Sequence, residues 1–327
     1  MSERLTHSRT RHVALPWLGM LLLFAVPFIV QGLGIPSLLG LATRIAIAAL
    51  AAASLNVLLG YGGLVSFGHA AYYGLGAYTV GILNAQFVSG DLLFGIIPGT
   101  NQLWFTLPAA MLVSGLVAVC LGALCLRTAG VQFIMITLAF AQMIYFLFIS
   151  LKAYGGDDGL LMRRPNIAPF VNLHNGAHMY YLAVACLIAY VLFCGRLMRS
   201  RFGRVIAGQR QSERRMVALG IQTYPYKLLA FVLAGMGAGL AGALTANYAH
   251  FVSPDLMHWT QSGDLLIMVV IGGAGRLWGP LLGAAVLIVL ETMLSGWTQY
   301  WQIIMGPILV LVALYAPQLH RRLDLSA

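Results

Sequence analysis

The sequence predicts an all-α membrane protein, a polytopic helical bundle of about ten transmembrane helices with both termini in the cytoplasm. Its composition is the first observation, because 60% of the 327 residues are hydrophobic and only 9% are charged. A soluble domain is usually about 25% charged. The second observation is that long stretches, such as 45–90 and 228–254, contain no charged residue at all. Since a helical crossing needs about 20 apolar residues, lipid must cover most of this chain.

The candidate crossings follow the apolar runs in chain order. They are 13–34, 38–60, 64–87, 103–126, 130–151, 178–196, 227–248, 263–275, 278–296 and 299–316. Together they form one membrane domain at 13–316, which contains a basic cytoplasmic loop at 197–226 and lies between cytoplasmic tails at 1–12 and 317–327. Arginines precede the first run, as they do in a signal peptide, but no clear cleavage site follows it, so we expect a retained helix.

The positions of the basic residues orient these helices. With the N-terminus inside, 15 of the 19 lysines and arginines fall on the cytoplasmic side, and Arg44 lies within a crossing. The three that fall outside are Lys152, Arg163 and Arg164. Basic residues concentrate in the cytoplasmic loops of membrane proteins. The net charge of +10 therefore reflects orientation in a membrane rather than nucleic-acid binding.

A glycine-rich segment, GYGGLVSFGHAAYYGLGAY at 60–78, overlaps the third crossing. Glycines allow helices to approach closely or to break, and irregular backbone at membrane depth is tolerated only against protein or a water-filled path. The crossings 64–87 and 263–275 are therefore candidates for broken or re-entrant segments beside a substrate route. Ser66 and His69 are candidates for lining that route or for a buried polar network. For His69 the alternative is a structural hydrogen bond between helices, and that alternative is favoured.

Two charged residues lie inside predicted crossings. Arg44 and Glu291 fall roughly 8–9 Å below the outer boundary of the membrane, at 1.5 Å per residue. Unpaired charges at this depth are expensive. We therefore expect Arg44 and Glu291 to approach each other or to face a wet cavity, and Asp264 can share their network. A stabilising ion pair is favoured over a substrate contact.

Other motifs give no sign of catalysis. GMGAGLAG at 235–242 contains the glycine pattern of dinucleotide-binding proteins, but no strand precedes it, so helix packing is the better interpretation. VVIGGAGRLWGPLLGA at 269–284 resembles the segment 60–78 in its glycine pair and aromatic–glycine step, which is a weak sign of an internal repeat. The sequence has no phosphate-binding loop, no nucleophile with a base at motif spacing and no metal-ligand spacing. We expect no catalytic residue, metal or cofactor in this chain.

The longest cytoplasmic loop, SRFGRVIAGQRQSERRMVALGIQTYPYK at 200–227, is strongly basic. A short helix is predicted from about Arg204 to Leu219, with its end at Gly220. For an arbitrary membrane protein, an amphipathic segment bound to lipid headgroups is about as good an interpretation as a docking site.

Seven segments, in order, resemble the inner-membrane permeases of ABC importers for branched-chain amino acids, specifically the M-type of the two paired permeases. They are SLNVLLGYGGLVSFGHAAYYGLGAY (54–78), LRTAGVQFIMITLAFAQM (126–143), GGDDGL (155–160), SRFGRVIAGQRQSERRMVALGI (200–221), YKLLAFVLAGMGAGLAGAL (226–244), FVSPDL (251–256) and VVIGGAGRLWGPLLGA (269–284). One such string is weak, but seven in order are highly specific.

The resemblance implies a heteromeric importer in the bacterial inner membrane. Its other parts would be a second permease, two cytoplasmic ATPases that bind and hydrolyse ATP, and a periplasmic substrate-binding protein. The segment 200–221 matches the family's coupling helix, which docks on the ATPase, and this match favours docking over headgroup binding. The residues assigned to the coupling loop are Arg204, Ser212, Glu213, Ala218 and Gly220. The last four match the family's pattern, whereas residues 214–217 depart from it and leave the identity of the ATPase open.

Two other classes of function compete with the importer. An ion-coupled secondary transporter would need a membrane-embedded carboxylate, for which Glu291 could serve, and a channel would conduct ions without ATP. The long basic loop and the seven segments favour the importer, which would work by alternating access. Its expected cargo is a branched-chain or related amino acid. Urea, amides and aromatic acids are the alternative cargoes, because a binding protein rather than the permease can select them.

Overall fold

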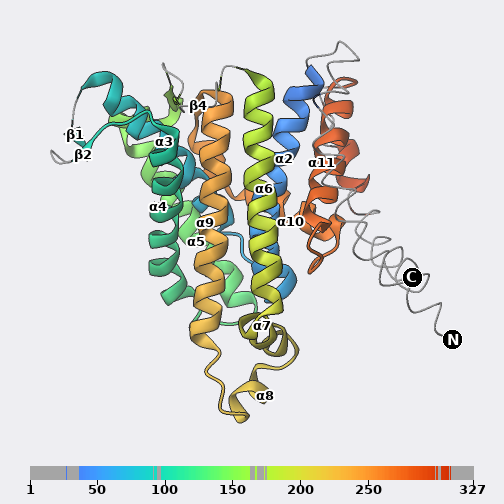
Figure 1. Cartoon of the computed structure of the whole chain (residues 1–327). Helices are drawn as coiled ribbons and strands as arrows, with labels where there is room; N and C mark the ends of the chain where they lie inside the picture. Colours follow the sequence, from blue (N-terminus) through green and yellow to red (C-terminus); the bar gives the residue numbers. More distant parts are fainter. Residues whose placement is uncertain are drawn as a thin grey trace.

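Nearly every described segment of the chain is helical in the computed structural model (Figure 1). The described residues are 27, 37–90, 92–93, 97–162, 166–167, 173, 175–298, 300, 303–308 and 310. The helices are α2 (Ser37–Asn56), η1 (Val57–Tyr61), α3 (His69–Ser89), α4 (Leu103–Cys125), α5 (Val131–Ser150), η2 (Lys152–Tyr154), η3 (Gly156–Asp158), α6 (Gly176–Arg199), α7 (Arg201–Gln211), α8 (Glu213–Ala218), α9 (Tyr224–Ala249), η4 (Pro254–Met257), α10 (Trp259–Gly272) and α11 (Gly279–Ser295). Two antiparallel pairs of two-residue strands join loops, β1 (Leu92–Leu93) with β2 (Ile97–Pro98) and β3 (Leu160–Leu161) with β4 (Phe251–Val252).

Among the described residues, five helices are long and apolar enough to cross a membrane. They are α4, α5, α6, α9 and the continuous stretch Ser37–Tyr61 formed by α2 and η1. The expectation of an all-α membrane bundle is therefore confirmed, but the count of ten crossings is not. The predicted crossing 13–34 lies outside the described residues except for residue 27, and 299–316 is described only in part. The helix α11 is apolar but shorter than the other five.

Helix α9 forms the centre of the bundle and packs against α2, α3 and α4. These contacts depend on the glycines of the segment 235–242. A Cβ atom on Gly239 would overlap the side chain of Ser114, and a Cβ atom on Gly76 of α3 would overlap the backbone of Gly239. Small residues let helix backbones approach this closely. The packing interpretation of GMGAGLAG is therefore confirmed.

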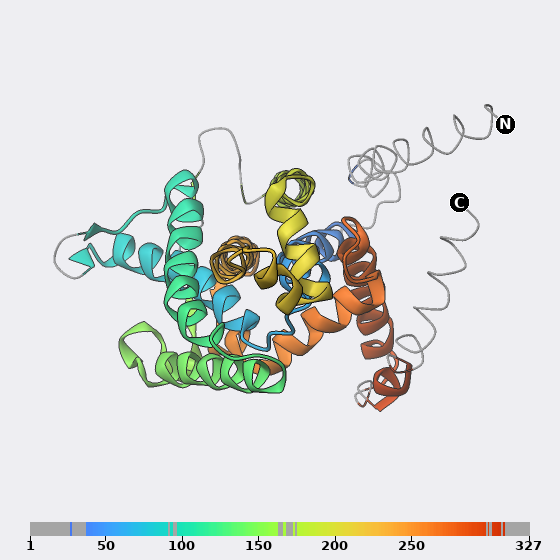
Figure 2. The same cartoon turned by 90° about the horizontal axis from the view of Figure 1, so that it is seen from below.

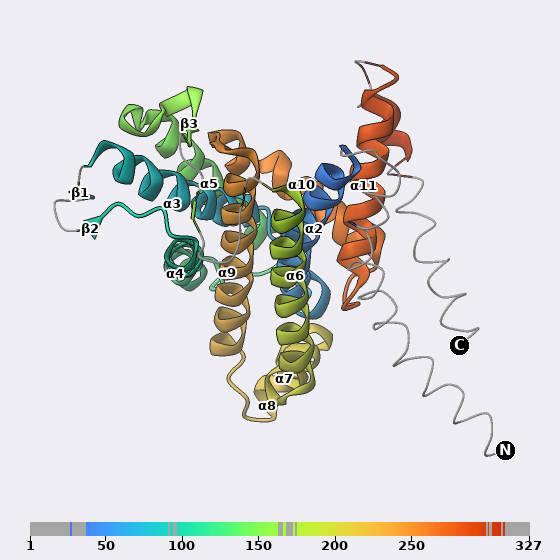
Figure 3. The ribbon, with the colours of Figure 1, turned by 45° about the horizontal axis from the view of Figure 1, so that its top comes forward.

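The segment 64–87 is interrupted before its helix begins. Residues 62–68 are irregular, and α3 starts only at His69. Seen from below, α6 and α9 are viewed along their axes while α3 runs across the picture (Figure 2), and the oblique view shows α3 crossing the direction of α9 (Figure 3). The predicted break thus lies at the start of this segment, and the helix after it is not parallel to the neighbouring long helices.

The segment 263–275 is interrupted at its other end. Helix α10 has 14 residues and stops at Gly272, so at 1.5 Å per residue it spans only about 21 Å of a hydrocarbon core about 30 Å thick. Gly273 and Gly275 follow with φ angles of 92° and 88°, in the left-handed region that glycine adopts without strain. The predicted short crossing is therefore the second part of α10 followed by a glycine turn into α11.

Candidate coupling and translocation sites

The coupling loop is two helices rather than the single predicted helix from Arg204 to Leu219. Helix α7 ends at Gln211, and α8 begins at Glu213. Ser212 separates them with an extended backbone, and its Oγ accepts a hydrogen bond of 3.4 Å from the N–H of Arg215. Serine is a favoured N-cap because its side chain satisfies a free N–H of the first helical turn. The prediction of one helix was wrong because this cap starts a second helix.

Gly220 ends the second helix. Its φ angle is 79°, the N–H of Gly220 donates to the carbonyl of Val217 at 2.9 Å, and the N–H of Ile221 donates to the carbonyl of Met216 at 3.1 Å. This pair of bonds closes the helix C-terminus in the Schellman arrangement, which favours glycine at the left-handed position. The predicted stop at Gly220 is therefore confirmed.

Glu213 ties the loop back to the bundle. Its Oε1 accepts hydrogen bonds from Lys227 Nζ at 2.6 Å and from Thr223 Oγ1 at 2.9 Å. The hydrogen bond from Lys227 lowers the pKa of the Glu213 carboxyl, with a smaller lowering from Thr223, and the effect of partial burial is outweighed. Because Thr223 and Lys227 lie at the start of α9, the first residue of α8 is held against the central helix.

The tip of the loop presents apolar side chains to its surroundings. Helices α7 and α8 project at the lower end of the bundle in Figure 1. Val217 is 58% exposed and Leu219 70% exposed, and of the predicted coupling residues all except the half-buried Ser212 are also exposed. An exposed apolar patch rimmed by charged residues is typical of a protein–protein contact.

Arg210 connects the loop to the membrane helices, and sequence analysis did not single it out. Its Nη1 donates a hydrogen bond to the carbonyl oxygen of Gly60 in η1. Next to this contact, Asn56 Nδ2 donates to the carbonyl of Arg276 at 2.9 Å, and Asn56 Oδ1 accepts from the N–H of Gly275 at 2.9 Å. A Cβ atom on Gly60 would overlap Asn56 and the backbone of Gly275. We call Asn56, Gly60, Arg210, Gly275 and Arg276 the glycine junction.

The glycine junction brings together the two glycine-rich segments that the sequence analysis found similar. One supplies Gly60 and the other supplies Gly275. The glycines that the two segments share therefore have a structural role, since a glycine lets another backbone approach closely. The signal for Asn56 was its polarity within the apolar run SLNVLLG. Arg210 had no such signal, because it binds a backbone carbonyl and needs no particular partner residue.

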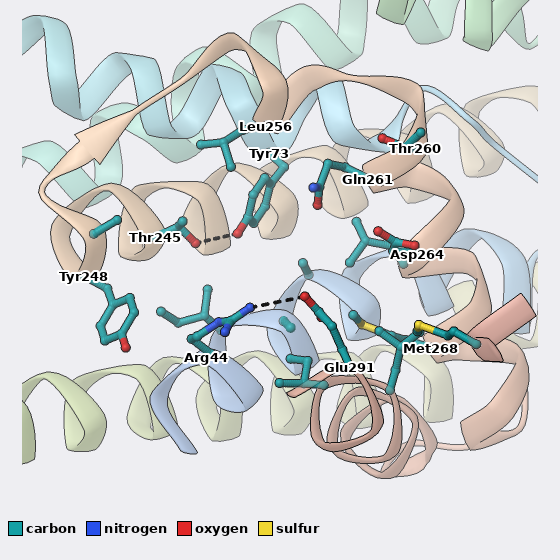
Figure 4. Close-up of a pocket in the computed structure, with 18 of the residues that line it drawn as sticks. Arg44, Tyr73, Thr245, Tyr248, Leu256, Thr260, Gln261, Asp264, Met268 and Glu291 are labelled. Atoms are coloured by element: carbon teal, nitrogen blue, oxygen red, sulfur yellow. Dashed lines mark hydrogen bonds and ion pairs between the residues drawn. The ribbon is translucent and has the colours of Figure 1, made fainter. Parts of the chain in front are cut away.

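A cavity of about 770 Å³ lies near the end of α9 that is remote from the coupling loop (Figure 4). Its polar lining residues are Arg44, Tyr73, Thr245, Tyr248, Thr260, Gln261, Asp264 and Glu291. Its apolar lining residues include Ile47, Leu256, Leu265, Met268, Leu287 and Ile288. From Tyr224 to Thr245, α9 rises by about 32 Å, so the loop and the cavity lie at opposite ends of the central helix.

The structure brings Arg44 and Glu291 together in this cavity. Arg44 Nη2 lies 3.8 Å from Glu291 Oε1, and their side chains are 49% and 32% exposed. Asp264 from α10 lines the same space (Figure 4). On another wall, Tyr73 Oη and Thr245 Oγ1 are 2.5 Å apart. The two alternatives expected for Arg44 and Glu291 thus occur together, since the two side chains approach each other and both line a cavity.

Ser66 and His69 lie elsewhere. Both are fully buried, and neither lines the cavity. His69 Nε2 is 2.7 Å from Ser54 Oγ, which itself donates to the carbonyl of Ala51 at 2.6 Å, so His69 is the donor of the pair. Ser66 Oγ accepts from the N–H of Gly68 at 3.2 Å. The bond between His69 and Ser54 holds α3 to α2, which accords with the structural alternative for His69, and the bond to Ser66 closes the turn before α3.

Comparison with known proteins identifies the family. The family described as branched-chain amino acid transport system / permease component matches residues 37–313. The chain belongs to this family. Among the described residues of this permease, no group of three or more histidine, cysteine, aspartate or glutamate side chains is placed to hold a metal ion.

Several curated permeases are similar to the chain. The high-affinity branched-chain amino acid transport system permease protein LivM of Salmonella typhimurium strain LT2 is 27% identical over 288 residues, which cover 81% of this chain and 65% of that protein. LivM of Escherichia coli strain K12 matches to the same extent. A probable branched-chain amino acid transport permease protein LivM of Methanocaldococcus jannaschii is 25% identical over 268 residues, with 74% and 76% covered. The chain thus spans less than two thirds of the length of the first two relatives. No solved structure shows a significant match.

Proposed function

We propose that this chain is the non-catalytic permease subunit of an ATP-driven importer for branched-chain amino acids. It forms half of the translocation path in a bacterial inner membrane, with both termini in the cytoplasm. Its partners are a second permease subunit, two cytoplasmic ATPases that bind the ATP, and a periplasmic substrate-binding protein. Family membership supports the transport function. The observation that carries the coupling to ATP is the hydrogen bond from Arg210 to Gly60, which ties the loop to the membrane helices.

The glycine junction is the common end of three of the helices that line the cavity, α2 with its extension η1, α10 and α11. Helix α2 carries Arg44 and continues into η1, which ends beside Arg210. Helix α10 carries Asp264 and ends just before Gly275, and α11, which carries Glu291, begins just after the same turn. A displacement of α7 therefore acts on three cavity-lining helices at once. Along α2 and η1, the distance from Gly60 to Arg44 is about 24 Å.

Alternating access follows from this connection. ATP binding would draw the two ATPases together and shift the coupling loop that docks on each permease. Through the glycine junction, the shift would tilt α2, α10 and α11 and change the side from which the cavity is reached. Rigid helices with two discrete arrangements can carry coupling over such distances. The cargo must bind the two arrangements with different affinity for its transport to be coupled to ATP.

The test of this function is uptake by the complete importer in proteoliposomes. The permease is reconstituted with its second permease, ATPases and binding protein, and uptake of radioactive leucine is followed with ATP, with a non-hydrolysable ATP analogue, or with an imposed proton or sodium gradient alone. We expect uptake with ATP only. Uptake driven by the ion gradient without ATP would assign the chain to the secondary transporters, and ion current without either would assign it to the channels.

A further inference from the structure

The cavity combines an ionic region with apolar walls. Arg44, Asp264 and Glu291 supply the charges, and Gln261 and Thr260 add neutral polar groups beside them. Leucine, isoleucine and methionine side chains from α2, η4, α10 and α11 line much of the remainder. Figure 4 shows Arg44, Gln261, Asp264 and Glu291 around the same space. Small-molecule sites typically have volumes of about 300–1,000 Å³ and combine apolar walls with a few polar groups. At about 770 Å³, this cavity lies within that range.

The ion pair in the cavity is incompletely satisfied. Arg44 Nη2 and Glu291 Oε1 are 3.8 Å apart. A hydrogen bond between a guanidinium and a carboxylate is usually shorter, at about 2.8 Å. The described residues that line the cavity include one basic side chain and two acidic ones, so one carboxylate lacks an equivalent cation. Because both side chains are partly exposed, the pair itself contributes little to stability, and its charged groups remain accessible to a ligand.

We propose that this cavity binds the zwitterionic head of an α-amino acid with an aliphatic side chain. Arg44 binds the carboxylate of the substrate, and Glu291 together with Asp264 binds its ammonium group. The aliphatic side chain lies against the apolar residues that line the cavity, which include Leu256 and Met268. This inference rests on the proposed import function and adds to it a substrate site within the permease, so that selection does not depend on a binding protein alone.

The charged groups of an amino acid complement the charged side chains of the cavity. Its ammonium group provides the second cation for the two carboxylates, and its carboxylate provides Arg44 with an acceptor at hydrogen-bonding distance. When no substrate is bound, Arg44 and Glu291 approach each other and partly neutralise their charges. A site that hydrogen-bonds both charged groups binds analogues that lack one of them more weakly, because a polar group of the site is then left without its partner.

A binding measurement on the permease–ATPase complex tests the proposal directly. The complex is placed in lipid nanodiscs without the binding protein, and equilibrium binding of L-leucine is compared with that of leucinamide, which lacks the carboxylate, and 4-methylpentanoate, which lacks the ammonium group. We expect saturable leucine binding and affinities about 10-fold to 100-fold weaker for both analogues. Absence of saturable leucine binding, or equal affinities for all three compounds, would overturn the proposal.

Three variants separate a substrate site from a structural ion pair. Arg44→Gln leaves Glu291 without its ion-pair partner, Glu291→Gln leaves Arg44 without its partner, and the double variant removes the pair while Asp264 remains. If the pair is structural, the double variant recovers the binding and uptake that the single variants lose, since neither member of the pair is left without the other. If the cavity binds the zwitterion, the double variant stays about 10-fold or more impaired in leucine binding. Lys152→Gln changes an exposed cation outside the cavity and should behave as the unmodified protein.

The failure of this proposal can be distinguished from failure of the proposed function. If the complete importer takes up leucine with ATP while the nanodisc complex binds none, the import function stands and the cavity site is wrong. If ATP-driven leucine uptake is also absent, the import function itself is wrong.

Discussion

Glu213 is the residue whose chemistry most directly holds the coupling loop in place. Its carboxylate receives one hydrogen bond from a charged amine and one from a hydroxyl, both at the start of α9. These contacts lower the pKa of Glu213 below its ordinary value of 4.5. A group with a lowered pKa contributes stability above its unfolded pKa and loses that contribution as the pH falls through the folded pKa. The loop should therefore stay docked on α9 near neutral pH and loosen in acid below pH 4.5.

Replacement of this carboxylate should reproduce the effect of acid. In Glu213→Gln, we expect the amides of α8 to exchange with deuterium faster than in the unmodified protein at about pH 7, by an amount equivalent to about 1 kcal/mol or less because the side chain is half exposed. As the pH falls from 4.5 through the lowered pKa of the folded state, the difference should shrink, since the unmodified carboxyl then becomes protonated as well. Hydrogen exchange of both proteins at each pH measures this. Arg214→Gln, at the exposed neighbouring position, is the control, and an unchanged difference at low pH would contradict the account.

Some residues of the sites could be predicted from the sequence, and others could not. Arg44 and Glu291 were predictable because a charge at membrane depth must find a partner or water. Gly220 was predictable because glycine after an amphipathic run is a helix-stop signal. Arg210 was not, since its acceptor is a backbone carbonyl and any residue type could provide it. Asp264 was predictable only as a member of the network, because its place in the cavity depends on how α10 packs.

At the scale of helices, the packing of α3 on α9 depends on glycines that meet backbone to backbone. Gly76 faces Gly239 so closely that a Cβ atom has no room. Gly263 in α10 offers a matched comparison, because a Cβ atom there would meet no atom within 4 Å. The same substitution at the two positions therefore separates helix propensity from helix contact.

The two alanine variants should differ in stability. We expect Gly76→Ala to destabilise the permease by about 1–3 kcal/mol, because the helices must move apart. We expect Gly263→Ala to be neutral or to stabilise it by about 0.4–1 kcal/mol, because alanine restricts the unfolded chain. Thermal unfolding of the detergent-purified proteins measures both. Equal melting temperatures for the two variants would show that the close approach of α3 and α9 is unimportant.

Some helix boundaries could be predicted from sequence patterns, whereas others depend on tertiary contacts. Long apolar runs predicted α4, α5, α6 and α9 closely, because burial in lipid requires length and apolarity. The coupling loop was predicted as one helix, yet Ser212 divides it. A serine within an amphipathic run is compatible with either outcome, and contacts of α8 with α9 decide between them. The breaks at 62–68 and after Gly272 were signalled by glycine, but the sequence did not show that the two broken segments meet.

At the scale of the whole molecule, the coupling loop and the cavity lie at opposite ends of α9 and share the helices that meet at the glycine junction. The charge pattern predicted which loops are cytoplasmic, and the ordered motifs predicted the family. Neither predicted the mechanical connection between loop and cavity. That connection depends on contacts of residues 56 and 60 with residues 275 and 210, which lie in three segments far apart in sequence.

The central claim is that ATPase motion reaches the translocation path through Arg210, and the ratio of leucine taken up to ATP hydrolysed tests it most directly. This ratio is measured in proteoliposomes for the complete importer with Arg210→Ala, and with Arg214→Ala as a control in the same loop. We predict that Arg210→Ala retains ATPase assembly and ATP hydrolysis but lowers leucine uptake about 10-fold or more, since coupling free energies are about 1–3 kcal/mol. The control should keep the normal ratio. An unchanged ratio for Arg210→Ala would contradict the account.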